Sequence, residues 1–210
     1  MVIYMQYLKI KQNVEALSCG KVELVCVSKY HTIEEIEEVY GMGQRHFGEN
    51  KVQDLLQKAD VLPKDIKWHL LGHLQTNKVK QIVGKVELIH SLDSIHLAEE
   101  IQKQSEKAGV VTNCLVQVNS TGIDDRFGVS YDELNSFIEQ VSNLPNICLA
   151  GIMGMAPKGE NPDPYFEKLK EAYENSPLKG KVLSMGMSED YESAIKNGST
   201  MVRLGRIIFE

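Results

Sequence analysis

Glu23-Leu-Val-Cys-Val-Ser-Lys-Tyr-His-Thr32 joins a short apolar run to the start of a helix. The apolar part has the composition of a buried strand. Thr32 and Glu35, three residues apart, have the spacing of a helix capping box. Lys29 therefore lies where a strand passes into a helix. In a barrel of alternating strands and helices, that junction is at the end that carries the active site.

The same alternation continues along the rest of the chain. Short strand-like runs are separated by segments with apolar residues at helical spacing. Eight strands interleaved with helices predict one α/β domain over residues 1–210, folded as a single (β/α)8 TIM barrel. A doubly wound open sheet is the alternative, but its G-x-G-x-x-G signature does not follow the first strand. The expected strands are 22–28, 45–48, 67–71, 86–90, 113–119, 148–154, 181–185 and 201–204, and the expected helices are about 4–18, 32–41, 49–60, 76–84, 94–107, 130–142, 164–175 and 188–197.

Composition and charge restrict the classes of protein. The 210 residues are 42% hydrophobic and 25% charged, as in ordinary globular chains. The net charge of −6 and the scattered lysines argue against nucleic-acid binding. No run approaches the roughly 18 apolar residues of a membrane span, and the N-terminus lacks a basic leader. We therefore expect a cytoplasmic protein without membrane contact, and a monomer, because no dimer-forming domain is evident.

Metal binding is not expected. The four cysteines form no C-x-x-C pair, so reduced structural thiols are the simpler interpretation. His69 and His73 are four residues apart, but their segment has strand composition and no carboxylate stands at metal-ligand spacing. The cysteines are Cys19, Cys26, Cys114 and Cys148, and the histidines interpreted as structural or surface residues are His46, His90 and His96.

Polar and glycine residues follow most of the predicted strands. Since the carboxyl ends of parallel barrel strands meet at one rim, these residues are expected to gather around one site. In chain order they are Lys29, Phe47-Gly-Glu-Asn50, Gly72-His-Leu-Gln-Thr-Asn-Lys78, Asn119 with Asp124, Asp125 and Arg126, Met155, Gly186-Met-Ser188 and Arg203-Leu-Gly205.

The segment Ser184-Met-Gly-Met-Ser-Glu-Asp190 has the features of an anion-binding loop. Gly186 frees the backbone to approach a ligand closely, and Ser188 is a good helix N-cap residue. The helix behind it would direct free N–H groups at an anion, and loops after strands seven and eight form the usual phosphate site of TIM barrels. The alternative is a plain glycine turn before a capped helix. Together with Lys29 and Arg203, the segment favours phosphate binding, with Gly205 completing the site.

Arg203 belongs to the apolar run of the last predicted strand. A charge inside such a run needs a partner. One interpretation is an ordinary ion pair inside the barrel. The other is a donor to the ring nitrogen of a bound pyridine cofactor, which would stay unprotonated opposite a permanent cation.

Five ordered blocks, which together span residues 25 to 209, resemble the pyridoxal phosphate homeostasis proteins, a family of barrels that bind pyridoxal 5′-phosphate (PLP). The blocks are Val27-Ser-Lys29, Phe47-Gly-Glu-Asn50, Trp68-His-Leu-Leu-Gly-His-Leu-Gln-Thr-Asn-Lys78, Ser184-Met-Gly-Met-Ser-Glu-Asp190 and Gly198-Ser-Thr-Met-Val-Arg-Leu-Gly205.

The resemblance implies a barrel like the N-terminal domain of alanine racemase, with PLP bound as a Schiff base on Lys29. It implies that Asn50 contacts the cofactor and that Arg203 faces the pyridine nitrogen. Ser188 and Gly205, with the neighbouring Gly186 and Met187, are implied to be the phosphate-binding residues. It also implies a role in PLP buffering and delivery, without established turnover.

Two further functions stay open at this point. One is a PLP-dependent amino-acid racemase, which needs an acid/base group on each face of the substrate. Lys29 serves one face, and Tyr30, Tyr131 and Tyr165 are candidates for the other. The second is a phosphate-sugar barrel enzyme in which Lys29 binds or attacks a carbonyl substrate directly. PLP-requiring apo-enzymes are the partners that the carrier function suggests.

Overall fold

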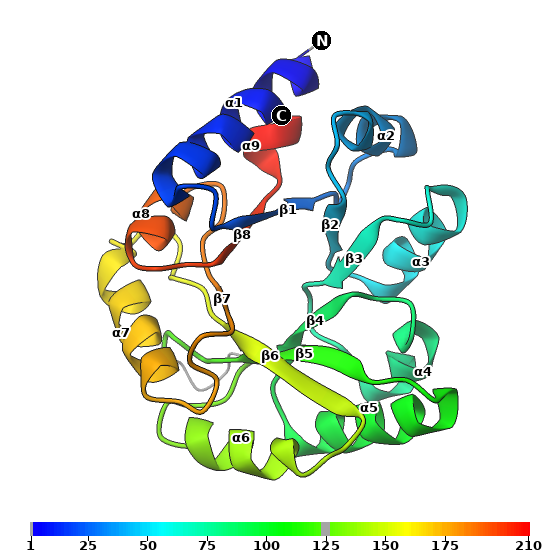
Figure 1. The fold of residues 1–210 in the computed structure, drawn as a ribbon, viewed down its shortest axis with the longest axis vertical. Coiled ribbons are helices and arrows are strands. Elements are labelled where there is room, and N and C mark those ends of the chain that lie inside the picture. Colours follow the sequence, from blue (N-terminus) through cyan, green and yellow to red (C-terminus); the bar gives the residue numbers. More distant parts are fainter. Residues whose placement is uncertain (1, 123–126) are drawn as a thin grey trace.

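The protein folds as a closed barrel of parallel strands in the computed structural model, which describes residues 2–122 and 127–210. Each strand pairs with the next in chain order, and β1 pairs with β8 to close the barrel (Figure 1). The predicted (β/α)8 TIM barrel is therefore confirmed. The strands are β1 (Glu23–Val27), β2 (His46–Glu49), β3 (Lys67–Leu70), β4 (Leu88–Leu92), β5 (Thr112–Gln117), β6 (Ile147–Met153), β7 (Val182–Ser184) and β8 (Met201–Leu204).

The helices surround the barrel (Figure 1). α1 precedes β1 and lies beside α9, so the segments at the two ends of the chain pack together (Figure 1). No helix of the described residues has the length and apolar character needed to cross a membrane. The helices are α1 (Val2–Ser18), α2 (Ile33–Gly41), α3 (Val52–Val61), the 3₁₀ helix η1 (Thr76–Lys78), α4 (Val79–Ile82), α5 (Ile95–Ala108), α6 (Leu134–Ser142), α7 (Asp163–Glu174), α8 (Tyr191–Lys196) and α9 (Arg206–Phe209).

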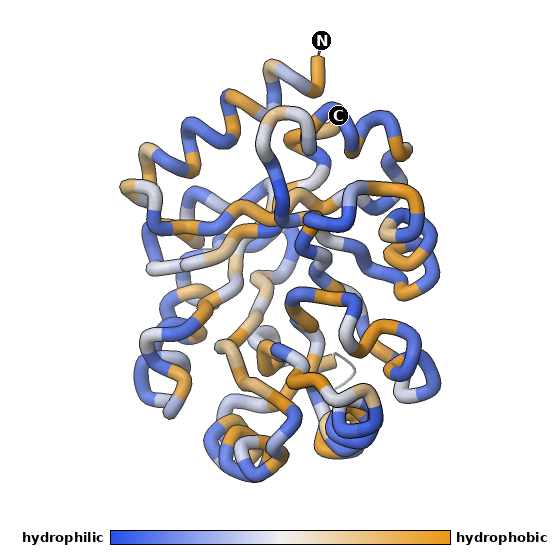
Figure 2. Tube along the Cα trace, turned by 45° about the vertical axis from the view of Figure 1, so that its right-hand side comes forward, coloured by the Kyte–Doolittle hydropathy of each residue, from blue (hydrophilic) through white to orange (hydrophobic). Residues whose placement is uncertain are grey.

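Two apolar layers hold the barrel together. Because strand side chains alternate between faces, Leu24 and Cys26 of β1 pack against the outer helices while Val25 points into the barrel. Along the helices, orange apolar positions recur among blue polar ones (Figure 2), as expected for segments with one buried face. The apolar cluster inside the barrel consists of Val25, Leu88, Leu115, Met153 and Met201.

The helix starts show where local sequence signals decide the structure and where they do not. The capping box predicted for Thr32 and Glu35 is formed at the start of α2. Ser130 and Glu133 have the same capping-box spacing at the start of the helix predicted over 130–142. The Glu133 N–H donates to Ser130 Oγ at 3.3 Å, but this bond closes a turn and α6 begins only at Leu134. The start predicted at residue 130 is therefore wrong by about one turn, because the same side-chain bond can cap a turn or a helix.

The predicted helix over 76–84 is divided into η1 and α4 and ends at Ile82. α9 was not among the predicted helices. It contains four residues, which are too few to show helical periodicity in the sequence.

Candidate functional site

A cavity of about 680 Å³ opens at the carboxyl ends of the strands, within the size range of small-molecule pockets. Residues that follow β1, β2, β3, β6, β7 and β8 line it. The cavity therefore collects side chains from across the chain, as expected for the functional rim of a TIM barrel. Six of the predicted site residues are among those that line it: Lys29, Asn50, Met187, Ser188, Arg203 and Gly205.

Lys29 is half-buried and directly follows Ser28 at the end of β1. The next residue, Tyr30, has a φ of 70°, which is the left-handed region that non-glycine residues rarely adopt. The residue is 86% exposed, so packing against the core does not hold it there. The left-handed turn lets the chain leave β1 sharply, and Lys29 reaches the cavity at the point where the turn begins.

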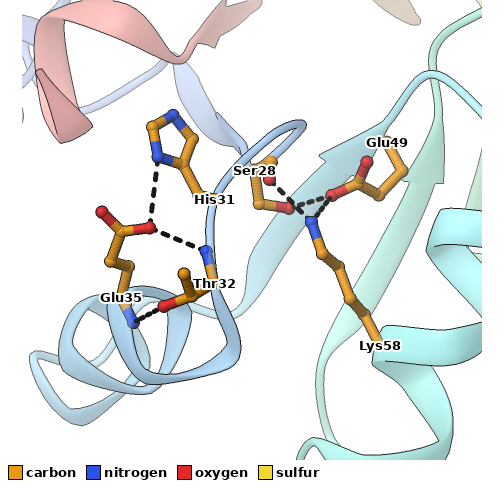
Figure 3. A network of polar contacts seen from close by, with 6 residues as sticks. All are labelled: Ser28, His31, Thr32, Glu35, Glu49 and Lys58. Carbon is orange, nitrogen blue, oxygen red and sulfur yellow. Dashed lines mark hydrogen bonds and ion pairs between the residues drawn. The ribbon is translucent and has the colours of Figure 1, made fainter.

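A buried polar network fixes the strand ends that precede Lys29 and Asn50 (Figure 3). Lys58 Nζ of α3 donates to Glu49 Oε1 at 2.7 Å and to the Ser28 carbonyl at 2.8 Å. The Ser28 hydroxyl donates to the same Glu49 oxygen at 2.7 Å. The network thus ties the ends of β1 and β2 to one helix, immediately before the two residues that line the cavity.

The sequence prediction did not single out Glu49 and Lys58 as a pair. Glu49 is completely buried, and an ionised carboxylate at such a position needs a cation. The available signal was Glu49 itself, an acidic residue at a strand position that faces the helix layer. Its partner could not be identified from the sequence, because several lysines lie nearby along the chain.

Asn50 is placed by a close approach between two loops. A Cβ atom on Gly72, which follows β3, would lie 2.2 Å from the Asn50 carbonyl oxygen. Only glycine allows the two backbones to come this close. Gly72 therefore fixes the backbone position from which the Asn50 side chain lines the cavity.

The loops after β7 and β8 face each other across the candidate anion site. The Gly205 N–H donates to Ser188 Oγ at 3.4 Å, and Arg206 Nη2 is 2.6 Å from Glu189 Oε1. Within the described parts of the chain, the backbone N–H groups of Ser188 and Arg206 have no acceptor. Ser188 and Arg206 both line the cavity, and free N–H groups on two neighbouring loops are suited to a phosphate group.

Ser188 is not the N-cap residue of the following helix, so that prediction is wrong. α8 begins at Tyr191 with Asp190 in the N-cap position. Asp190 Oδ1 accepts the N–H of Met187 at 2.6 Å, which makes residues 187–190 a separate turn before the helix. The turn leaves Ser188 at the cavity wall, where its hydroxyl meets the loop after β8.

Gly186 is not among the residues that line the cavity. Its φ is +99°, and a Cβ atom there would lie 2.6 Å from the Cβ of Ala194 in α8. The glycine is therefore required for a left-handed backbone and for the close packing of α8. Direct contact of Gly186 with a ligand stays a prediction.

Arg203 is a buried cation at the floor of the cavity. Its side chain donates to Ser184 Oγ at 2.6 Å and to the Gly154 carbonyl at 3.2 Å. Burial lowers the pKa of Arg203 to about 10, against the attraction of Asp190, so the guanidinium stays charged at neutral pH. No carboxylate of the described residues is within ion-pair distance of the Arg203 guanidinium. The interpretation as an ordinary ion pair is therefore not supported, and a donor aimed at a ligand remains.

His73, which belongs to the segment predicted at the rim after the third strand, also lines the cavity. Its Nδ1 is 3.3 Å from Asp93 Oδ2, and its ring stacks on Phe127 at a centroid distance of 3.9 Å. Burial raises the pKa of Asp93, against the opposing effect of His73. His69 belongs to β3 and points inside the barrel, so the two histidines do not share a site.

In residues 2–122 and 127–210, no group of three or more His, Cys, Asp or Glu side chains is arranged to hold a metal ion. All four cysteines carry free thiols. Asp124, Asp125 and Arg126, expected at the rim after the fifth strand, lie outside the described residues.

Comparison with known proteins shows the fold class of this chain. The family model for the N-terminal domain of alanine racemase matches residues 6–210. In agreement, the alanine racemase of Corynebacterium glutamicum superposes with a TM-score of 0.75 over 96% of this chain and 60% of that one, at 15% identity. This likeness concerns the fold.

Two proteins with higher sequence identity to this chain identify its family within that fold. A pyridoxal phosphate homeostasis protein from Aquifex aeolicus is 43% identical over 91% of this chain and 87% of its own length. PipY of Synechococcus elongatus is 32% identical over 99% of this chain and all of that one, with TM-scores of 0.89 without PLP and 0.85 with PLP bound. The chain belongs to the family of pyridoxal phosphate homeostasis proteins, which share the alanine racemase N-terminal domain fold.

Proposed function

We propose that this chain binds PLP in the cavity at the carboxyl ends of the strands and acts in intracellular PLP homeostasis. One observation carries the proposal: Lys29, the buried Arg203 and free N–H groups after β7 and β8 line the same cavity. PLP offers an aldehyde to an amine, a ring nitrogen to a cationic donor and a phosphate to N–H groups. The residues present therefore fit each part of PLP.

Each residue has a separate task in this proposal. Lys29 supplies the amine that forms a Schiff base with the aldehyde of PLP. Arg203 donates to the ring nitrogen and, as a permanent cation, keeps it unprotonated. Ser188, Gly205 and Met187 line the phosphate end of the cavity, where the N–H groups of Ser188 and Arg206 are free to bind the phosphate, while Asn50 contacts the cofactor from the end of β2. Val27 and Met153 give the cavity an apolar wall.

The proposed role is storage and delivery of PLP without turnover. In that role the protein is a cytoplasmic monomer whose partners are enzymes that require PLP. A racemase needs a second acid/base group opposite Lys29. Among the described residues, the cavity lining contains no tyrosine, and Tyr165 donates instead to Glu160. Without a tyrosine on the second face, storage is the better supported function.

The test is a titration of the purified protein with PLP, followed in the visible spectrum, with borohydride reduction and peptide mapping. We expect a yellow band that reduction converts into a stable adduct on Lys29. Lys29→Ala should remove the band and the adduct. Lys158→Ala is the matched control, because Lys158 lines the mouth of the same cavity but is exposed, and it should leave both unchanged.

Three results would contradict the proposal. An adduct on Lys158 instead of Lys29 would show that Lys29 does not supply the amine. No band and no adduct would favour a phosphate-sugar enzyme of the same fold. Interconversion of L- and D-amino acids by the PLP-loaded protein, at ordinary enzyme rates and beyond one turnover per site, would replace storage by racemisation.

A further inference from the structure

Three histidines from consecutive strands form a hydrogen-bonded chain through the interior of the barrel. His46 Nδ1 is 2.9 Å from His69 Nε2, and His69 Nδ1 is 2.9 Å from His90 Nε2. The side chains come from β2, β3 and β4. His69 and His90 are only 1% and 0% exposed, so each must find its hydrogen-bond partners inside the protein.

The histidine chain connects two cavities at opposite ends of the barrel. On one side, His90 Nδ1 is 3.3 Å from Ser184 Oγ, the atom that accepts a hydrogen bond from Arg203. Arg203 lines the candidate PLP cavity. On the other side, His46 Nε2 is 3.7 Å from Glu23 Oε2, and both residues line a second cavity of about 370 Å³ at the amino ends of β1 and β2.

The direction of the hydrogen bonds in the chain follows from the Glu23 carboxylate. An ionised carboxylate only accepts, so His46 carries its proton on Nε2, which faces Glu23, and Nδ1 accepts from His69 Nε2. In a neutral ring the other nitrogen then has no proton, so His69 Nδ1 accepts from His90 Nε2. By the same rule His90 Nδ1 accepts the hydroxyl proton of Ser184, whose oxygen also accepts from Arg203.

The surroundings keep the two inner rings neutral. Burial lowers the pKa of His69 to about 3, and the positive charges of His46, when protonated, and of Lys67 act in the same direction. Burial also places the pKa of His90 well below its usual value, with His69 and Arg203 adding to the effect. Neutral rings are what a single donor direction along the chain requires.

His46 is the ring that takes up a proton first. Its side chain is 17% exposed in the second cavity. Burial is the largest influence and lowers its pKa, Glu23 and Glu87 oppose this, and Lys67 reinforces it. The proton therefore enters below about pH 6.5, the usual value for histidine.

We propose that the chain His46–His69–His90–Ser184 is a relay that transmits protonation at the amino end of the barrel to Arg203 in the PLP cavity. A proton added to His46 occupies Nδ1, opposite the Nε2–H of His69. Two donors cannot share one hydrogen bond, so His69 and then His90 change to the tautomer that carries its proton on Nδ1. One proton enters in total, and each inner ring only exchanges the position of its own.

At the end of the relay, the bond between His90 and Ser184 is reversed. His90 then donates to Ser184 Oγ, and the hydroxyl proton of Ser184 must turn elsewhere. Ser184 Oγ still accepts from Arg203, but its O–H dipole has turned, so the electrostatic surroundings of Arg203 change. His46, His69 and His90 are thus positioning residues that act on the cofactor through Arg203. This consequence rests on the proposed function, whereas the relay itself does not.

The relay is tested first in the protein without PLP, by nitrogen NMR of chain labelled with 15N-histidine. At pH 8 we expect the rings of His46, His69 and His90 to carry their proton on Nε2. On acidification, the inner rings should change to the Nδ1–H tautomer with the same midpoint as the protonation of His46. An inner ring with its proton on Nδ1 at pH 8, or inner rings that do not respond when His46 titrates, would overturn the proposal.

The second test follows the visible band of bound PLP from pH 8 to pH 5 in matched variants. His46→Gln and His69→Leu should both lose the component of the pH-dependent shift that coincides with the His46 midpoint. His96→Gln is the control, since His96 is exposed on α5, and it should retain that component. A component that survives in His46→Gln would overturn the proposal, whether or not His69→Leu folds. If wild-type protein gives no PLP band, the proposed function fails while the NMR result still decides the relay.

Discussion

Lys58 Nζ lies 2.7 Å from Oε1 of Glu49, whose side chain is 0% exposed. This buried ion pair joins α3 to β2, and the hydrogen bonds of Ser28 extend it to β1. Lys29 and Asn50, which line the cavity, are the next residues along the two strands. The ion pair therefore supports the cavity from behind without contacting a ligand.

Lys58→Met is expected to destabilise the protein by about 3 kcal/mol, because it leaves the Glu49 carboxylate buried without its cation. Urea unfolding, followed by circular dichroism, measures the change. Glu49→Gln combined with Lys58→Met should recover part of the loss, since the charge is then absent. Lys51→Met, at an exposed position just before α3, should change stability by less than about 0.5 kcal/mol. Equal midpoints for Lys58→Met and wild type would show that the pair contributes nothing.

Gly72→Ala is expected to displace the end of β2. The new methyl group would lie 2.2 Å from the Asn50 carbonyl oxygen, so one of the two loops must move. We expect weaker PLP binding, measured by titration, together with a loss of stability of about 1–3 kcal/mol. Gly41→Ala is the control, because a Cβ atom there meets nothing within 4 Å, and it should be neutral or slightly stabilising. Unchanged PLP affinity in Gly72→Ala would separate Asn50 from the site.

Arg203→Gln is expected to weaken PLP binding by about ten- to a hundredfold, the equivalent of a hydrogen bond to a charged group. The ring nitrogen would also gain proton affinity, so the absorption band should shift between pH 8 and pH 6. Arg45→Gln, which removes an exposed pair with Asp65, should leave both properties unchanged. Identical affinity and spectra for Arg203→Gln and wild type would remove Arg203 from the site.

Acid should destabilise the protein through its buried histidines. The pKa of His69 in the folded state is about 3 and that of His90 is also far below the usual value, so below about pH 6.5 the unfolded chain binds more protons than the folded one. Stability is therefore fully present above pH 6.5 and lost as pH falls, by up to about 1.4 kcal/mol per pH unit for each buried ring.

The measurement is the free energy of unfolding between pH 7 and pH 5. The slope of this free energy against pH reports how many protons the chain takes up on unfolding. In His69→Leu that number should fall by about one, whatever the effect of the substitution on stability at neutral pH. His96→Gln should not change the slope, because His96 is exposed. A slope that is the same in His69→Leu and wild type would mean that His69 is already protonated in the folded protein.

Much of the fold was predictable because its signals are local. Alternating apolar runs located all eight strands, and Thr32 with Glu35 formed the predicted capping box. The prediction was wrong where a local bond has two outcomes, as at Ser130, where a capping pair closes a turn instead of opening a helix. Ser188 failed as an N-cap residue because Asp190 lies closer to the start of α8.

The amino-acid sequence was sufficient to predict the barrel, its rim and six of the residues that line the cavity, because strand period and chain order decide which residues share an end of the sheet. Only the tertiary structure decided the partners of the buried charges and rings. Glu49 at the end of β2 pairs with Lys58 of α3, and His69 of β3 joins His46 of β2 to His90 of β4. Such contacts depend on strand register and side-chain direction in a closed barrel, and neither leaves a periodic signal in the sequence.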